Sequence, residues 1–380
     1  MNLRPINAAQ NRAVSIVFLG EPPMKLSSLL IATAVSMTLA VHAHATDRGK
    51  AYVSNQKGGV TVIDLNTYTA GADIDVQGDE PRGIAITDDG KLLVVATREN
   101  GSVSIIDTAT NQVISQVKVG QNPEFVRIKG HYAFVSYEPS AKGGPPPAPG
   151  SAEALAAAKE EAEDDDKEPA RIGIIDLKLG KKIREITGGP ETEGIEFSKD
   201  GKQLIVTNEA DNTVTVHSMK TGKLLKTIKT HEYGDRPRGI KVSPDGKTYL
   251  ATLEYGNKFL VMDKKFKVLR TVDTGATPYG IAYDRKGERI YVAANKAKTL
   301  EVYNAKTYEK IKDIPTGNRC WHFTFTPDDK EILLACGKSD AVMVIDTDKL
   351  EVTQQIENKK LPWGVVTYPK SMGSLDTAIK

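Results

Sequence analysis

The 380-residue sequence has few of the motifs that usually carry metal, haem or nucleophilic chemistry. Its two cysteines, Cys320 and Cys336, do not form the paired-cysteine spacing of a zinc site, and there is no CxxCH motif for covalent haem attachment. A GxSxG nucleophile elbow and a glycine-rich phosphate loop are also absent. The sequence therefore identifies no catalytic residues and no metal ligands, and we predict no cofactor.

A strong excess of charge of one sign is absent too. The formal net charge is +2, and 26% of the residues are charged while 39% are hydrophobic. This composition is typical of soluble globular proteins. Whole-chain charge therefore gives no reason to propose nucleic acid or an anionic membrane surface as a partner.

Long apolar runs are missing except near the N-terminus. From Met24 the chain has a basic Lys25, then uncharged and largely apolar residues 26–41, then the small-residue segment Ala43-His44-Ala45. This pattern predicts a secretory signal that starts at Met24 and is cleaved after Ala45, with residues 1–45 as extension plus signal. The alternative is an uncleaved membrane anchor, but the run is shorter than the roughly 20 residues that a spanning helix needs. We therefore expect an exported protein with no membrane span after cleavage, in a compartment where a disulfide can persist.

What the sequence does contain is an internal repeat. Segments resembling PRGIAITDDGKLLVVAT begin at residues 81, 123, 192, 237, 278, 320 and 362, which are 42, 69, 45, 41, 42 and 42 residues apart. The one long interval holds an insertion, residues 139–170. Each unit has the pattern of four short strands joined by Asp-Gly-type turns. Four-stranded units of this length are typical of β-propeller blades.

The two ends of the chain complete the count of blades. The segment after Lys50 has only the last three strands of a unit, and the final PWGVVTY from Pro362 has only the first. Joining both in one blade closes the ring and removes exposed strand edges. We predict an all-β, seven-bladed β-propeller as a single domain over residues 46–380.

Three repeat segments carry a family resemblance. AYVSN (51–55), IVTN (205–208) and VAAN (292–295), each followed by a strand like V.VID, resemble the YVTN repeat of seven-bladed β-propellers, closest to the periplasmic YncE-like proteins. The resemblance implies a periplasmic location, association with quinone-dependent oxidation and, in some members, nucleic-acid binding. The tryptophan-docking repeat of quinone-containing dehydrogenase propellers is missing, so we expect a chain that accompanies such an enzyme rather than one that acts as it.

The second residue of each unit is predicted to ring one mouth of the central channel. In blade order these residues are Arg82, Glu124, Glu193, Arg238, Tyr279, Trp321 and Trp363. One interpretation is a pocket with aromatic surfaces for a flat or apolar ligand, in which Arg82 and Arg238 bind its carboxylate or phosphate. The other is an aromatic plug in which Arg and Glu neutralise each other. His322, at a position where most units have glycine, is a further candidate for ligand contact.

The insertion and the cysteines both bear on this mouth. Residues 139–170 are proline-rich and then acidic, which predicts disorder, and they serve either as a solvated tether or as an acidic flap over the basic part of the mouth. Cys320 begins the first strand of its unit and Cys336 ends the second, so the two lie opposite each other if Phe325 pairs with Glu331. We predict a disulfide between them, with two buried thiols as the alternative.

These observations favour an exported, periplasmic binding or scaffold protein, monomeric, that uses the channel mouth for a small molecule or a periplasmic protein. Two alternatives stay open. One is a lactonase-like or lyase-like enzyme in the channel, for which only Glu124, Glu193 and His322 are nearby candidates. The other is single-stranded nucleic-acid binding, which the acidic insertion disfavours.

Overall fold

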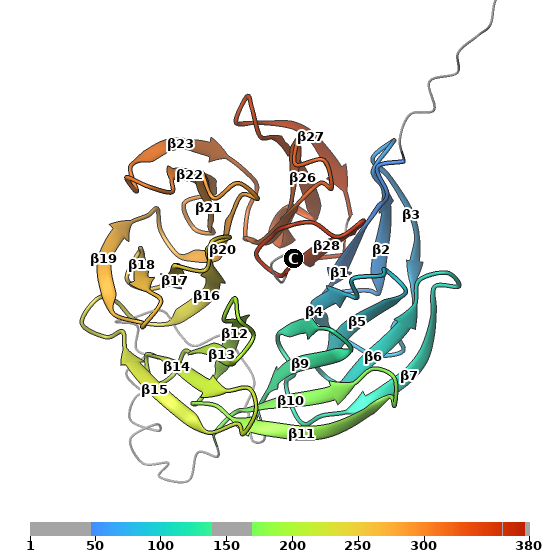
Figure 1. Ribbon diagram of the computed structural model, residues 1–380. Coiled ribbons are helices and arrows are strands. Elements are labelled where there is room, and N and C mark those ends of the chain that lie inside the picture. Colours follow the sequence, from blue (N-terminus) through green and yellow to red (C-terminus); the bar gives the residue numbers. More distant parts are fainter. Residues whose placement is uncertain (1–46, 139–168, 359, 377–380) are drawn as a thin grey trace, which may run out of the picture. The chain divides into compact units, whose positions relative to one another are not determined.

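The computed structural model describes residues 47–138, 169–358 and 360–376. In these residues the chain forms seven four-stranded antiparallel sheets arranged in a ring (Figure 1), which confirms the predicted seven-bladed propeller. We number the blades from 1 to 7, starting with the sheet that contains β4. The strands of blades 1 to 3 are β4 (Pro81–Ile86), β5 (Leu92–Thr97), β6 (Ser102–Asp107) and β7 (Gln112–Lys118); β8 (Val126–Lys129), β9 (Tyr132–Tyr137), β10 (Arg171–Asp176) and β11 (Lys181–Thr187); and β12 (Thr192–Phe197), β13 (Gln203–Asn208), β14 (Thr213–Ser218) and β15 (Leu224–Lys229). Those of blades 4 to 6 are β16 (Pro237–Val242), β17 (Thr248–Leu253), β18 (Lys258–Asp263) and β19 (Val268–Asp273); β20 (Pro278–Tyr283), β21 (Arg289–Ala294), β22 (Thr299–Asn304) and β23 (Lys310–Pro315); and β24 (Cys320–Phe325), β25 (Glu331–Cys336), β26 (Ala341–Asp346) and β27 (Glu351–Glu357).

Blade 7 joins the two ends of the described chain, as predicted. Its strands are β28 (Pro362–Tyr368), β1 (Lys50–Asn55), β2 (Val60–Asp64) and β3 (Thr69–Ile74). β28 pairs antiparallel with β1, with Tyr52 opposite Val366. The ring is therefore closed by hydrogen bonds between segments about 300 residues apart.

The insertion falls between β9 and β10, the second and third strands of blade 2. Its residues 139–168 lie outside the described residues, and so do residues 1–46 with the predicted signal and cleavage site. The expectations about disorder, export and cleavage therefore stay predictions. In the described ranges, no helix is long and apolar enough to cross a membrane.

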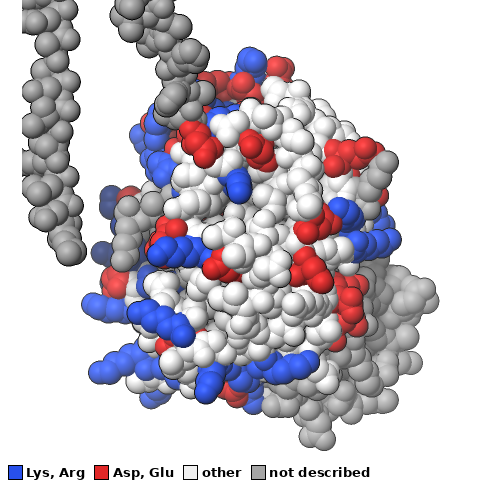
Figure 2. Space-filling view, turned by 90° about the vertical axis from the view of Figure 1, so that its right-hand side faces the viewer, with Lys and Arg blue, Asp and Glu red and all other residues white. Residues whose placement is uncertain are grey.

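Burial decreases from the centre of the ring outward. The innermost strands are almost entirely buried, whereas outer strands such as β7 and β11 are mostly exposed or half-buried, with one buried residue each. Both faces of an inner strand pack against neighbouring blades; Ile205 and Val214 of blade 3, for example, share one core with Ile240 and Leu260 of blade 4. The outer strands carry lysines and glutamates, which disfavour pairing with other chains. On the side of the propeller next to β3 and β7, acidic and basic side chains form small separate groups (Figure 2).

A β-bulge near the start of the innermost strand recurs in six blades. In β16, for example, Pro237 pairs with Leu253 but Ile240 pairs with Ala251, so β16 has one extra residue between the two pairs. The same shift occurs in β4, β12, β20 and β24, and β28 has its extra residue between Pro362 and Gly364. A bulge of this kind redirects side chains, and it allows the second residue of the strand to face the channel.

The bulge also explains one error in the sequence-based register. Cys320 and Cys336 lie opposite each other and form a disulfide, as predicted. Phe325, however, pairs with Ile332 rather than with Glu331, because β24 carries its extra residue between Cys320 and Phe323. The predicted disulfide is confirmed, while the ladder from which it was argued is wrong beyond the bulge.

Candidate functional site

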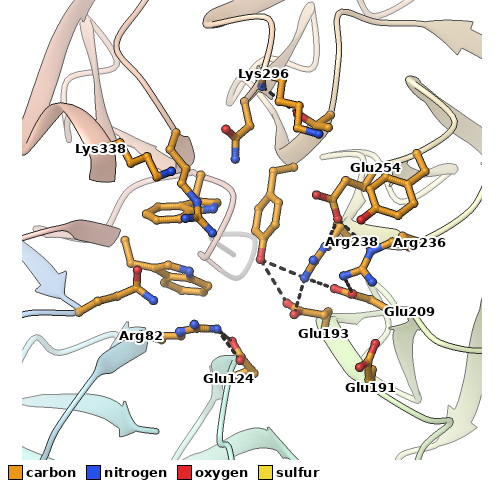
Figure 3. Close-up of a pocket in the computed structure, with 18 of the residues that line it drawn as sticks. Arg82, Glu124, Glu191, Glu193, Glu209, Arg236, Arg238, Glu254, Lys296 and Lys338 are labelled. Carbon is orange, nitrogen blue, oxygen red and sulfur yellow. Dashed lines mark hydrogen bonds and ion pairs between the residues drawn. The ribbon is translucent and has the colours of Figure 1, made fainter. Parts of the chain in front are cut away.

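The seven residues predicted to ring the channel mouth all line one pocket of about 520 Å³ (Figure 3). Each lies at the second position of its repeat unit, at the start of the inner strand or, for Glu124, just before it, where the chain arrives from the previous blade. Glu138, the last described residue before the insertion, lines the same pocket, so the insertion leaves the propeller at this mouth. The pocket wall includes eight basic and six acidic side chains.

On blades 1 and 2, Arg82 and Glu124 neutralise each other. The Arg82 guanidinium donates to Glu124, with Nη1 and Oε2 2.6 Å apart, and the buried Glu124 also lies 3.7 Å from Arg98. Burial raises the pKa of Glu124, and the charge of Arg82 opposes that rise. Arg82 is therefore engaged inside the protein rather than free to bind an anion.

On blades 3 and 4, a larger network surrounds Arg238. Its guanidinium donates to Glu193 at 2.5 Å and to Glu254 at 2.7 Å, and it forms an ion pair with Glu209. Arg236 donates to Glu254 as well, at 3.2 Å, and pairs with Glu209. Burial alone would lower the pKa of Arg238, but the surrounding acidic groups raise it well above its ordinary value. Arg238 therefore stays charged and fully engaged.

These two clusters correct the predicted role of the arginines. Arg82 and Arg238 were expected to offer positive charge to a ligand, whereas the structure pairs both with carboxylates (Figure 3). The alternative interpretation, in which Arg and Glu neutralise each other around the mouth, describes this half of the pocket. Sequence position placed the residues correctly but did not say which charges would pair.

The aromatic residues of blades 5 to 7 form the floor of the pocket and close the channel. Tyr279, Trp321 and Trp363 expose only 6%, 5% and 1% of their surface. The Arg238 guanidinium lies 4.8 Å from the centre of the Tyr279 ring, and that of Arg319 lies 4.9 Å from the Trp321 ring. The aromatic side chains therefore act as a plug, as the second interpretation proposed, and they offer a ligand a floor rather than broad open faces.

Four cations near the aromatic side of the pocket were not predicted from the sequence. Lys296 and Lys298 follow β21, and Lys338 follows β25, while Arg319 precedes β24. Among the described residues, no carboxylate forms an ion pair with any of the four, in contrast to the arginines of the opposite wall. Figure 3 shows Lys296 and Lys338 apart from the Arg/Glu clusters. The repeat did contain a signal for these lysines, because they lie in loops between the second and third strands of their blades, as the insertion does in blade 2.

His322 lies beneath this floor and does not line the pocket, contrary to the sequence-based grouping. Its ring centre is 4.4 Å from that of Trp363, 5.3 Å from Tyr279 and 5.8 Å from Phe125 on the far side of the channel. Burial and the nearby cations lower its pKa well below the ordinary value, so the imidazole is neutral. Most units have glycine at this position. At Gly280, for example, a Cβ atom would lie 2.5 Å from the Trp321 carbonyl oxygen. Two units have Phe125 and His322 here instead, and these side chains fill the channel.

Glu138 is a pocket carboxyl group with a pKa near neutrality. Burial, followed by the charges of Glu191 and Glu124, raises the pKa of Glu138 to about 7. A group with such a pKa can take up or release a proton at neutral pH. In the described ranges, no group of three or more His, Cys, Asp and Glu side chains is arranged to hold a metal ion.

Two family profiles match parts of the sequence. The profile described as Lactonase, 7-bladed beta-propeller, matches residues 176–263 and 195–310, and that described as Cytochrome D1 heme domain matches residues 27–127. Each covers less than half of the chain and shows a similarity only. Residues 47–127, the described part of the second match, contain no histidine, methionine or cysteine, which are common axial ligands of haem iron. The described part of this match therefore supplies none of these ligands, and we derive no function from it.

Solved structures of other propellers are similar to the described chain. A functionally unknown protein from Desulfotomaculum acetoxidans has 16% identity, a TM-score of 0.69, and an alignment covering 84% of this chain and 98% of that one. Kuenenia stuttgartiensis hydrazine synthase has 21% identity, a TM-score of 0.64, and coverage of 79% and 93%. A putative 6-phosphogluconolactonase from Bacteroides uniformis has 16% identity, a TM-score of 0.66, and coverage of 84% and 99%.

The sequence matches no curated protein. At these identities the structural similarities show the fold alone, and the specific resemblance to YVTN-repeat, YncE-like proteins stays a prediction. The comparisons thus identify this chain as a seven-bladed β-propeller with partial similarity to propeller lactonases.

Proposed function

We propose that this protein is an exported, periplasmic binding protein that holds a small organic anion at the channel mouth. The observation that carries the proposal is the division of the pocket: paired Arg and Glu side chains on one side, and on the other, beside an aromatic floor, four cations that form no ion pair with a carboxylate of the described residues. An anion entering this pocket meets Lys296, Lys298, Arg319 and Lys338 without having to break an existing ion pair. Its apolar or planar part lies against Trp321 and Tyr279.

The experiment compares two probes that differ only in charge. The mature protein is titrated with 2-naphthoate and with its neutral isostere 2-naphthamide, and tryptophan emission is followed, since both tryptophans of the chain are in the pocket floor. We expect 2-naphthoate to bind more tightly, and its affinity to fall as salt is added because the cations are exposed. Equal affinity for both probes, or no binding of either, would contradict the proposal.

A second candidate function is lactone hydrolysis, favoured by the partial lactonase match and by Glu138. With a pKa of about 7, Glu138 could accept a proton from water that attacks a lactone carbonyl, after which the ring C–O bond breaks to give a hydroxy acid. The test is hydrolysis of glucono-δ-lactone, corrected for the spontaneous rate. Hydrolysis that Glu138→Gln abolishes would support the lactonase function. A rate equal to the spontaneous rate would exclude it for this lactone.

The location and partners of the protein belong to the same proposal. We expect the mature chain to start at Thr46, to be monomeric and to be recovered from the periplasm, with a role accessory to quinone-dependent oxidation. Mass spectrometry of protein purified from the exporting cell measures the N-terminus and identifies any bound small molecule or co-purifying protein. If single-stranded nucleic acid were the ligand instead, its affinity would fall steeply with ionic strength.

A further inference from the structure

The half of the channel opposite the pocket contains buried charges that the pocket does not use. They come from the fifth residue of each repeat unit. Around the ring these residues are Ala85, Arg127, Glu196, Lys241, Ala282, Thr324 and Val366. Arg127, Glu196 and Lys241 expose almost none of their surface. Buried charges need partners, and here part of the partnership comes from the C-terminal tail.

The tail, residues 371–376, runs into the centre of the ring (Figure 1). It lies beside β24 on the edge that faces the channel: the Phe325 amide donates to the Met372 carbonyl at 2.7 Å, and the Ser374 amide donates to the Phe323 carbonyl at 2.9 Å. These bonds pair the free inner edge of β24. The tail therefore fills the channel from the end opposite the pocket.

Buried cations hold this tail through its backbone. Arg127 donates to the carbonyl oxygen of Ser374 at 2.9 Å and to that of Asp376, and Lys241 donates to the same Asp376 oxygen. Glu196 lies 3.9 Å from Arg127 and 3.8 Å from Lys241 and offsets their charge. The tail is thus fixed by contacts with strands of several blades.

One tail side chain reaches the floor of the pocket. The Ser374 hydroxyl lies 3.1 Å from Nδ1 of His322, and the other ring nitrogen of His322 has no hydrogen-bond partner among the described residues. The orientation of an imidazole about its last side-chain bond is soft, so its hydrogen bond decides it. The His322 ring in turn packs against Trp363 and Tyr279, two of the three floor residues.

We propose that Ser374 is a positioning residue for the ligand pocket: through His322 it fixes the aromatic floor from the opposite side of the ring. This inference rests on the proposed function, because it concerns the same pocket. It gives the tail a role that closing the channel does not require.

The test uses point variants of the full mature chain. Ser374→Ala removes the hydroxyl that lies against His322 and that also accepts from the Phe323 amide at 3.0 Å and donates to the Phe323 carbonyl at 3.1 Å. Ser371→Ala is the matched control, because Ser371 is also buried in the tail and donates to the Thr326 carbonyl at 3.0 Å without contacting His322. We expect Ser374→Ala to weaken 2-naphthoate binding by about 3- to 10-fold, the value of one hydrogen bond, and to shift tryptophan emission. Ser371→Ala lowers thermal stability but leaves affinity and emission as in the wild type.

If the tail variants unfold, His322→Phe alone keeps the inference open to refutation: it retains an aromatic ring without the bond to Ser374 and should weaken 2-naphthoate binding, and unchanged affinity would contradict the inference. If the tail variants fold, adding Ser374→Ala to His322→Phe should cause no further loss of affinity. Equal effects of Ser374→Ala and Ser371→Ala, or additive effects in the double variant, would overturn the inference. If the wild type does not bind 2-naphthoate, the proposed function fails, while a change in emission specific to Ser374→Ala still decides whether the tail positions the floor.

Discussion

Arg238 connects three carboxylates at the pocket wall, and replacing it tests whether this half of the mouth is a structural network. Arg238→Met keeps much of the side-chain length but removes the positive charge that pairs with the carboxylates of Glu193, Glu209 and Glu254. Arg236 still pairs with two of them, so Glu193 is left without its ion pair. The variant therefore contains the nearly buried Glu193 carboxylate without the positive charge that it faces in the wild type.

The expected cost follows from burial. Removing one partner of a buried ion pair costs about 3–5 kcal/mol, and we expect the free energy of unfolding to fall by this amount at pH 8. Burial alone would raise the pKa of Glu254, and Arg238 and Arg236 lower it instead. Without Arg238 the pKa of Glu254 rises, so the folded variant binds more protons than the unfolded chain above about pH 4.3, where glutamate ordinarily titrates. The deficit should therefore shrink as the pH falls from 8 to 5.

The assay is urea unfolding followed by tryptophan emission at both pH values. Arg285→Met is the control: Arg285 pairs with Asp329, but both side chains are more than one-third exposed, and such pairs contribute about 0–1 kcal/mol. A loss below about 1 kcal/mol in Arg238→Met at pH 8, or a deficit that grows on acidification, would refute the reasoning.

Two further predictions follow from the same contacts. Because the pKa of Glu138 in the folded protein, about 7, is above the ordinary value, Glu138 stabilises the fold at low pH and loses that contribution as the pH rises through about 7. Glu138→Gln should therefore flatten this part of the profile of stability against pH, measured by thermal unfolding between pH 4.5 and 7.5. An unchanged profile would contradict the raised pKa. The Cys320–Cys336 disulfide closes a loop with a sequence separation of 16, so replacing both cysteines by serine should cost about 3 kcal/mol, measured by urea unfolding, and wild-type stability in the double variant would argue against its contribution.

The repeat made the ring predictable, but not the pairing of charges within it. The spacing of the units placed Arg82, Glu124, Glu193 and Arg238 at one mouth, because every blade repeats the same strand. Which carboxylate an arginine reaches depends on side-chain conformation and on residues outside the second position, such as Glu209. The repeat therefore predicted where these charged side chains lie but not which of them form ion pairs.

The tail could not be predicted from the repeat, since it belongs to no unit. Ser374 and Asp376 contact strands that are far apart in the sequence, and a short polar segment gives no periodic signal. A partial signal did exist: Arg127, Glu196 and Lys241 are charged residues at one repeat position inside otherwise apolar strands. Charges there indicate that something polar fills the channel.

The central claim is that Lys296, Lys298 and Lys338 at the mouth, which pair with no carboxylate of the described residues, attract an anion, and one affinity measurement tests it directly. The variant Lys296→Gln, Lys298→Gln, Lys338→Gln is compared with Lys264→Gln, Lys286→Gln, Lys330→Gln, which changes net charge equally in turns at the opposite ends of the strands. At about 0.5 kcal/mol for each exposed charge, the account predicts an approximately tenfold weaker binding of 2-naphthoate in the first variant and wild-type affinity in the second. Equal affinity in both variants would contradict it.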